Sequence, residues 1–150
     1  MLSSSLEWLS SRLDAVRDQL ASHGISRRST RAKLRIAFDV VDARAYATEG
    51  TIYVAWWWLA WAWALCENED TERLLRHEMA HVLGWRYPRV LSAFGIPEYP
   101  AGWVIESRRV LHMLGVLPSY GDVHPEEALA ERVADLHPAT LRKVARALRR

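Results

Sequence analysis

The chain has 150 residues, half of them hydrophobic and a quarter charged, and its formal net charge at pH 7 is +2. This length suffices for one domain with a buried core, and the composition is that of an ordinary globular protein. The small net charge gives no electrostatic reason to expect a nucleic-acid partner. The single cysteine, Cys66, excludes an intramolecular disulfide framework and suits a reducing compartment. We therefore expect one cytoplasmic domain spanning residues 1–150.

Two segments, residues 1–24 and 52–66, bear on export and membrane insertion. Residues 1–24 lack the basic start and unbroken apolar stretch of a signal peptide, and leucines at helical spacing predict an amphipathic helix instead. A capping box from Ser4 to Glu7 is expected to begin this helix, and Gly24 to end it. Residues 52–66 contain five tryptophans but are shorter than the about 20 residues of a transmembrane helix. We expect no transmembrane segment, with interfacial membrane contact as the alternative to burial.

Residues 33–41 and 51–58 carry the strand signals. Hydrophobic side chains alternate in the first segment, and the second is dense in Ile, Tyr, Val and Trp. The polar connection at 42–50 ends in glycine, which predicts that the two strands pair antiparallel. The alternative is an all-helical domain in which residues 51–65 form no strand.

Helices are expected to follow these strands. The first runs over residues 71–83 and is closed by Gly84. Residues 86–102 are rich in proline and glycine, which predicts mostly loop or short turns. A second helix is expected over residues 103–114. The sequence thus favours a mixed α+β domain, mostly helical, with about three strands packed against the helix over 71–83.

The C-terminal third is predicted to end in two helices. Pro125 is well placed as the first residue of one helix, which Pro138 limits. Residues 138–150 predict a short amphipathic helix. A solvated face is one interpretation of its basic side, and a patch for phosphate or an acidic partner is the other. The basic residues of this helix are Arg142, Lys143, Arg146, Arg149 and Arg150.

A His-Glu-x-x-His motif, formed by His77, Glu78 and His81, lies in the helix over 71–83. Residues i and i+4 of a helix share a face about 6 Å apart, so the two imidazoles can bind one ion. Glu78 is rotated by about 100° from His77, so its carboxylate lies beside the metal and can hold a metal-bound water. Zinc lowers the pKa of such a water toward about 7, and a carboxylate then accepts the proton. The motif predicts one Zn²⁺ per chain.

A catalytic zinc site needs a third protein ligand and an open fourth position. The class with a third histidine six residues after the motif is not matched, because Tyr87 stands there. Three acids four residues apart, Glu127, Glu131 and Asp135, are expected on one face of the downstream helix. One acid can bind the metal while the acid one turn later accepts a hydrogen bond from a ligand histidine. The spacing permits either Glu127 with Glu131 or Glu131 with Asp135.

The motif together with Tyr120, Glu127 and Glu131 resembles the gluzincin peptidases of the anthrax lethal factor type. It is also similar to short bacterial proteins described as zinc-binding metallopeptidases. In that family the glutamate seven residues after the tyrosine is the ligand. The resemblance implies that Glu127 is the third ligand, that Tyr120 stabilises the oxyanion and that Glu131 orients a histidine. The thermolysin-like pattern would choose Glu131 and Asp135 instead.

The resemblance implies a zincin-like fold and a zinc-dependent endopeptidase. Glu78 would be the general base and Tyr120 the oxyanion donor. Zincins hold the substrate peptide as an added strand at a sheet edge, which the resemblance places near Thr51 to Trp56. Two alternatives remain open. One is a regulatory cytosolic gluzincin that cuts a single partner, such as a repressor; the other is a zinc-stabilised binding module without catalysis.

Overall fold

The computed structural model describes residues 2–40, 43–96, 110–111, 113–116 and 126–150. This part of the chain is a mixed α+β structure with six helices and one three-stranded sheet, so the predicted fold class is confirmed. Its elements in chain order are α1 (Leu2–Ala21), β1 (Lys33–Ala37), β2 (Ala45–Ala47), β3 (Thr51–Ala55), α2 (Trp56–Ala64), α3 (Asn68–Arg86), α4 (Pro88–Ala93), α7 (Glu127–Ala134) and α8 (Pro138–Arg149).

The sheet differs from the antiparallel pair predicted from the sequence. β3 is the central strand, with β1 parallel on one side and β2 antiparallel on the other. The chain turns from β2 into β3 at residues 48–50, where the backbone N–H of Thr48 donates to the Thr51 carbonyl at 2.9 Å. The pairing prediction was wrong because β2, a strand within the predicted connection, occupies the antiparallel position beside β3. β1 therefore pairs along the other edge.

The tryptophan-rich segment is divided between a strand and a helix. β3 ends at Ala55 and α2 follows it directly, so the predicted strand through residue 58 is three residues too long. Alanine and leucine between the tryptophans favour the helix. The buried residues Trp58, Leu59 and Ala62 recur at helical spacing and face the core. Among the helices of the described residues, none combines the length and hydropathy of a membrane span.

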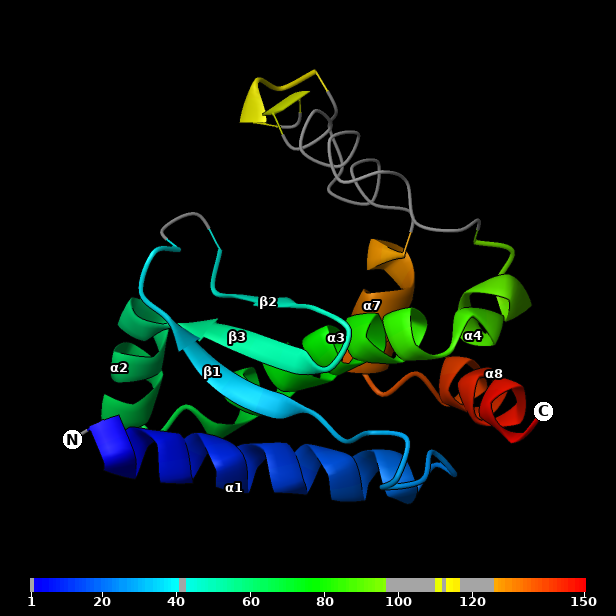
Figure 1. The fold of residues 1–150 in the computed structure, drawn as a ribbon, viewed down its shortest axis with the longest axis horizontal. Helices are drawn as coiled ribbons and strands as arrows, with labels where there is room; N and C mark the ends of the chain where they lie inside the picture. The colour runs from blue at the N-terminus through cyan, green and yellow to red at the C-terminus, as the bar shows by residue number, and fades with distance from the viewer. Residues whose placement is uncertain (1, 41–42, 97–109, 112, 117–125) are drawn as a thin grey trace.

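α1 runs along one side of the molecule and packs on α3 (Figure 1). The helix begins at Leu2, so Ser4 and Glu7 lie inside its first two turns and do not form the predicted capping box. A capping serine must occupy the non-helical residue before the first turn, and here that turn starts earlier. Gly24 follows the helix with φ +89°, as a helix stop requires. The core residues from α1 are Leu9, Leu13, Val16 and Leu20.

α3 is longer than predicted at both ends, and Gly84 lies inside it. The helix ends before Tyr87 because the residue preceding a proline is disfavoured in the helical region, and Pro88 follows. Pro88 begins α4, a short helix where loop was mostly expected. The helix predicted over 103–114 lies largely outside the described residues, as does Pro125, the predicted first residue of the next one.

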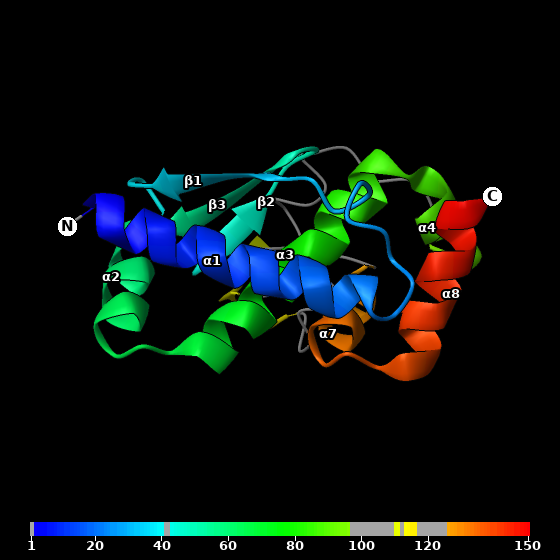
Figure 2. The ribbon, with the colours of Figure 1, turned by 90° about the horizontal axis from the view of Figure 1, so that it is seen from below.

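Two views show the ends of the molecule. α2 lies at one end, whereas α4, α7 and α8 gather at the other (Figure 1 and Figure 2). α7 packs directly on α3. Arg76 of α3 fixes this contact, since its Nε donates to the Ala134 carbonyl at 2.7 Å and its Nη1 to Gln19 Oε1 of α1 at 2.8 Å. The α3–α7 contact holds the candidate site.

Candidate metal centre

Three side chains from two helices converge where α7 meets α3. His77 and His81 are one turn apart on α3, and Glu127 is the first residue of α7. All three side chains are largely buried. One nitrogen or oxygen atom from each lies within 4.8 Å of those of the other two. The three residues form a cluster that could hold one metal ion.

Four atoms face one another at the centre of this cluster. His77 Nε2 is 2.9 Å from Glu127 Oε2, and His81 Nε2 is 3.1 Å from Glu127 Oε1. The two Nε2 atoms are 3.3 Å apart. Glu127 therefore presents one carboxylate oxygen to each imidazole.

The outer nitrogen of each imidazole has its own carboxylate. His77 Nδ1 is 2.9 Å from Glu131 Oε1, and His81 Nδ1 is 3.1 Å from Glu126 Oε1. A carboxylate that accepts the Nδ1 proton fixes the tautomer in which Nε2 carries a lone pair. In that tautomer the Nε2 lone pairs and the Glu127 oxygens point toward one another, so a cation can replace the protons through which the histidines bond to Glu127 in the metal-free protein. This donor set fits a cation such as Zn²⁺.

The pKa values of the cluster show that it attracts positive charge. Burial alone lowers the pKa of His81, but its hydrogen bonds to Glu126 and Glu127 outweigh burial and raise that pKa to about 10. Burial also lowers the pKa of His77, and the hydrogen bond to Glu127 again reverses the direction. For Glu127, burial raises the pKa, but hydrogen bonds from both histidines lower it to about 2. Glu127 is therefore a carboxylate across the physiological pH range.

Glu78 follows His77 on α3 and is buried. Its burial raises the pKa of the carboxyl group, and the neighbouring His81 and His77 only partly offset this. A carboxylate whose pKa lies above its ordinary value is a better proton acceptor. The position and the direction of this shift both suit the base predicted from the sequence.

The geometry distinguishes the acids of the downstream helix. Glu131 faces His77 Nδ1 and also accepts from Arg73 Nη2 at 2.5 Å, so it lies on the outer side of that imidazole. Asp135 contacts the same guanidinium, with Oδ1 3.1 Å from Arg73 Nη2. Glu127 alone among these three acids faces the Nε2 atoms. The arrangement favours Glu127 with Glu131 over Glu131 with Asp135.

Two residues of the site were not predicted from the sequence. Glu126 is 2% exposed and faces His81, and Gly84 lies on α3 three residues after that histidine. A Cβ atom at Gly84 would come within 2.8 Å of Glu126 Oε2. The prediction that Gly84 closes the helix was wrong, since α3 continues to Arg86. The missing side chain of Gly84 instead leaves room for the Glu126 carboxylate. The sequence does show a glycine after the motif and a glutamate next to Glu127. Their relation becomes visible only once α7 is known to pack on α3.

The remaining predicted site residue, Tyr120, lies outside the described residues. Its contact with the metal stays a prediction. Comparisons of the chain with models of protein families, with curated proteins and with solved structures gave no significant match. The functional argument therefore depends on the geometry of the cluster itself.

Proposed function

We propose that the chain is a zinc-dependent endopeptidase whose metal is held by His77, His81 and Glu127. The convergence of two Nε2 atoms and one buried carboxylate carries this proposal. Two imidazoles, one carboxylate and no sulfur form a ligand set of catalytic zinc sites, which keep a fourth position for water. Carboxylates behind both imidazoles are a further feature of such sites.

The chain's own residues supply the remaining chemistry. A zinc ion bound here would polarise the scissile carbonyl and acidify a water molecule. Glu78 accepts a proton from the attacking water and delivers it to the leaving amine. Tyr120, by the family resemblance, donates a hydrogen bond to the developing oxyanion. Glu126 and Glu131 keep the two imidazoles in the orientation that directs Nε2 inward.

The substrate peptide is proposed to bind as an added strand next to β2, and not next to Thr51–Trp56 as the sequence predicted. Both edges of β3 are already paired, so its own backbone is not available along Thr51–Ala55. β2, by contrast, pairs on one side only within the described sheet, and it contacts α3. The expected strand near Thr51 to Trp56 is therefore assigned to the free edge of β2. Tyr46 of β2 stacks on Tyr53 of β3, with ring centroids 4.7 Å apart, and stiffens this edge.

The replacement Glu78→Gln tests the mechanism. An amide is nearly isosteric with the carboxylate but cannot act as a base at neutral pH, so zinc and fold should be kept and hydrolysis lost. Glu69→Gln is the matched control, because Glu69 is exposed in the first turn of the same helix. Hydrolysis of a peptide library should fall about 100-fold or more in Glu78→Gln only. Equal rates for Glu78→Gln and the parent would reject the mechanism.

The same assay separates the alternatives. A parent protein that holds zinc and cuts one partner protein but no library peptide would be the regulatory gluzincin. A parent that holds zinc and cuts neither would be the binding module. An intact Glu78 argues against the binding module, because a purely structural zinc site has no use for this carboxylate.

A further inference from the structure

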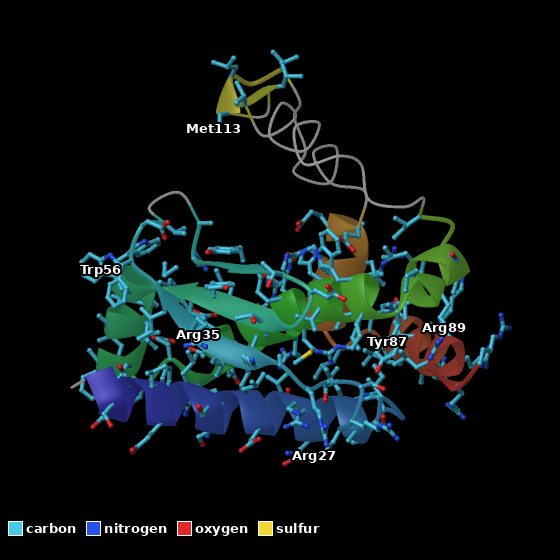
Figure 3. All side chains as sticks on the ribbon, in the orientation of Figure 1. Arg27, Arg35, Trp56, Tyr87, Arg89 and Met113 are labelled. Atoms are coloured by element: carbon cyan, nitrogen blue, oxygen red, sulfur yellow. The ribbon has the colours of Figure 1, made fainter. Side chains whose placement is uncertain are left out.

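A groove of about 410 Å³ runs along α8 at the end of the molecule opposite α2, and Ala93 of α4 borders it. Ala147 of α8 is buried in its lining, whereas Ala139 is exposed. Arg89 of α4 ties α4 to the C-terminal part of α8. Its Nε donates to the Ala147 carbonyl at 2.8 Å and its Nη2 to the Leu148 carbonyl at 3.0 Å. Figure 3 shows Arg89 at this junction of α4 and α8.

Four cations line the same groove. Arg142, Arg146 and Arg150 recur every four residues and so follow one face of α8 to its C-terminal end. Lys143 completes the set, with Nζ 4.7 Å from the centroid of the Phe94 ring, which holds it beside α4. None of the described residues that line the groove is acidic. The ion pairs found in the described part of the chain use none of these four cations.

The helix dipole explains only part of this charge. Cations in the last turn of a helix are favourable, which accounts for Arg146 and the residues after it. Arg142 and Lys143 are the fifth and sixth of the twelve residues of α8, where the dipole gives no such benefit. Like charges four residues apart also repel each other. An anion in the groove would remove this repulsion.

Residues 138–150 carry a local excess of positive charge. The whole sequence has 20 Lys and Arg against 18 Asp and Glu, but residues 138–150 hold five of the cations and none of the acids. Residues 27–35 also hold five cations and no acid, but Arg27 of that run pairs with Asp14 and Asp18. The second run is therefore the natural control for an attraction by charge alone.

We propose that the groove between α4 and α8 binds a small ligand that carries two or more phosphate groups. Three arginines supply planar forks that pair with phosphate oxygens two at a time. Arg142 and Arg146 lie one turn apart, so their guanidinium groups can pair with neighbouring phosphate groups of one ligand. The volume also falls in the range of small-ligand sites. This site is separate from the metal cluster and does not depend on the peptidase proposal.

Calorimetric titration with inorganic triphosphate tests the proposal. Arg142→Gln with Arg146→Gln should weaken binding about tenfold or more, because two charge-assisted contacts are removed. Arg28→Gln with Arg31→Gln is the matched control, since both arginines are exposed and lie on the connection between α1 and β1. The control should bind as the parent does. No binding by the parent, or equal weakening in both double variants, would overturn the proposal.

Two further variants separate a groove from a diffuse field and from zinc chelation. Ala139→Leu keeps every charge but narrows the groove, so it should weaken triphosphate binding by about tenfold if the ligand enters the groove. Removal of metal from the parent with a chelator should leave triphosphate binding unchanged, because the groove does not include the metal cluster. The proposed site would be contradicted by unchanged binding in Ala139→Leu, by loss of triphosphate binding after chelation, or by a parent that binds a single-stranded oligonucleotide but not triphosphate.

Discussion

His77 and His81 face the same carboxylate, yet their outer nitrogens lie in different surroundings. The partner of His77 is Glu131, whose side chain is 51% exposed and shared with Arg73. The partner of His81 is Glu126, whose side chain is 2% exposed and packs against Gly84. An exposed ion pair is screened by water, whereas a buried carboxylate loses its hydration and must be satisfied by its protein partner. The comparison teaches that two carboxylates at similar distances from the ligand histidines can differ in how strongly they fix the orientation of those histidines.

The His81 side is thus expected to be the rigid half of the cluster. The pKa shifts agree with this difference. Glu126 is among the groups that raise the pKa of His81 to about 10, whereas the hydrogen bond that raises the pKa of His77 comes from Glu127. The four predictions that follow are ordered by the size of the expected effect.

Of the two outer carboxylates, Glu126 and Glu131, we expect Glu126 to have the larger effect on zinc affinity when it is replaced. Glu126→Ala leaves the buried His81 Nδ1 without its acceptor, so zinc affinity should fall by about 100-fold, the upper end for such partners. Glu126→Gln should retain part of the affinity, because its amide oxygen can still accept the Nδ1 proton. Competition with a chromogenic chelator measures both variants. Parent-like affinity in Glu126→Ala would remove the proposed difference between the two histidines.

Gly84→Ala should weaken zinc binding about tenfold by displacing Glu126. The new Cβ would lie 2.8 Å from Glu126 Oε2 and 3.1 Å from Leu91 Cδ2. At an exposed helix position the same change stabilises a protein by about 1 kcal/mol, so a loss of function here would be a packing effect. In a Glu126→Ala background the replacement should cost no further zinc affinity, since the group it displaces is gone. Additive losses in the double variant would contradict this explanation.

Glu131→Ala should weaken zinc binding by only about tenfold, and less at high salt. In this variant, water can partly take the place of the exposed Glu131 carboxylate at His77 Nδ1, and Arg73 loses one contact near the surface. Titrations at low and high salt should show a salt-dependent loss here and a salt-independent loss in Glu126→Ala. The opposite salt dependence would reverse the assignment of the rigid half.

The smallest expected effect is the difference between Glu126→Ala and Glu131→Ala in the pH dependence of the metal-free protein. The pKa of His81 rises from 6.5 to about 10 in the fold, so its stabilising contribution is fully present below about 6.5 and is lost as the pH rises through about 10. Urea unfolding with a chelator should show a falling free energy of unfolding between pH 7 and pH 10. Glu126→Ala should flatten this fall more than Glu131→Ala does. A flat parent profile would show that His81 is not held as a cation.

The spacing of residues along the sequence correctly predicted those features of the molecule that depend on a single helix or strand. The face shared by His77 and His81 follows from 3.6 residues per turn, and so does the pair Glu127 and Glu131. The fold class followed from the strand signals of residues 33–41 and 51–58 and from hydrophobic residues at helical spacing elsewhere in the chain. These features need no knowledge of which elements touch.

Features that depend on contacts between elements were missed. The position of β2 beside β3 is decided by a turn at residues 48–50, which strand propensity does not reveal. The role of Gly84 exists only because α7 brings Glu126 to within 2.8 Å of the place its Cβ would occupy. A glycine near a helix end otherwise predicts a stop. Such residues become visible only when the packing of α7 on α3 is known.

The central claim is that Glu127, and not Glu131, completes the metal site. The most direct measurement is the zinc content of purified parent, Glu127→Ala and Glu131→Ala proteins, followed by a zinc titration of each. The account predicts about one zinc per chain in the parent, little zinc in Glu127→Ala, and zinc retained with weaker affinity in Glu131→Ala. Retention by Glu127→Ala with loss from Glu131→Ala would contradict it and transfer the ligand role to Glu131, with Asp135 as its partner.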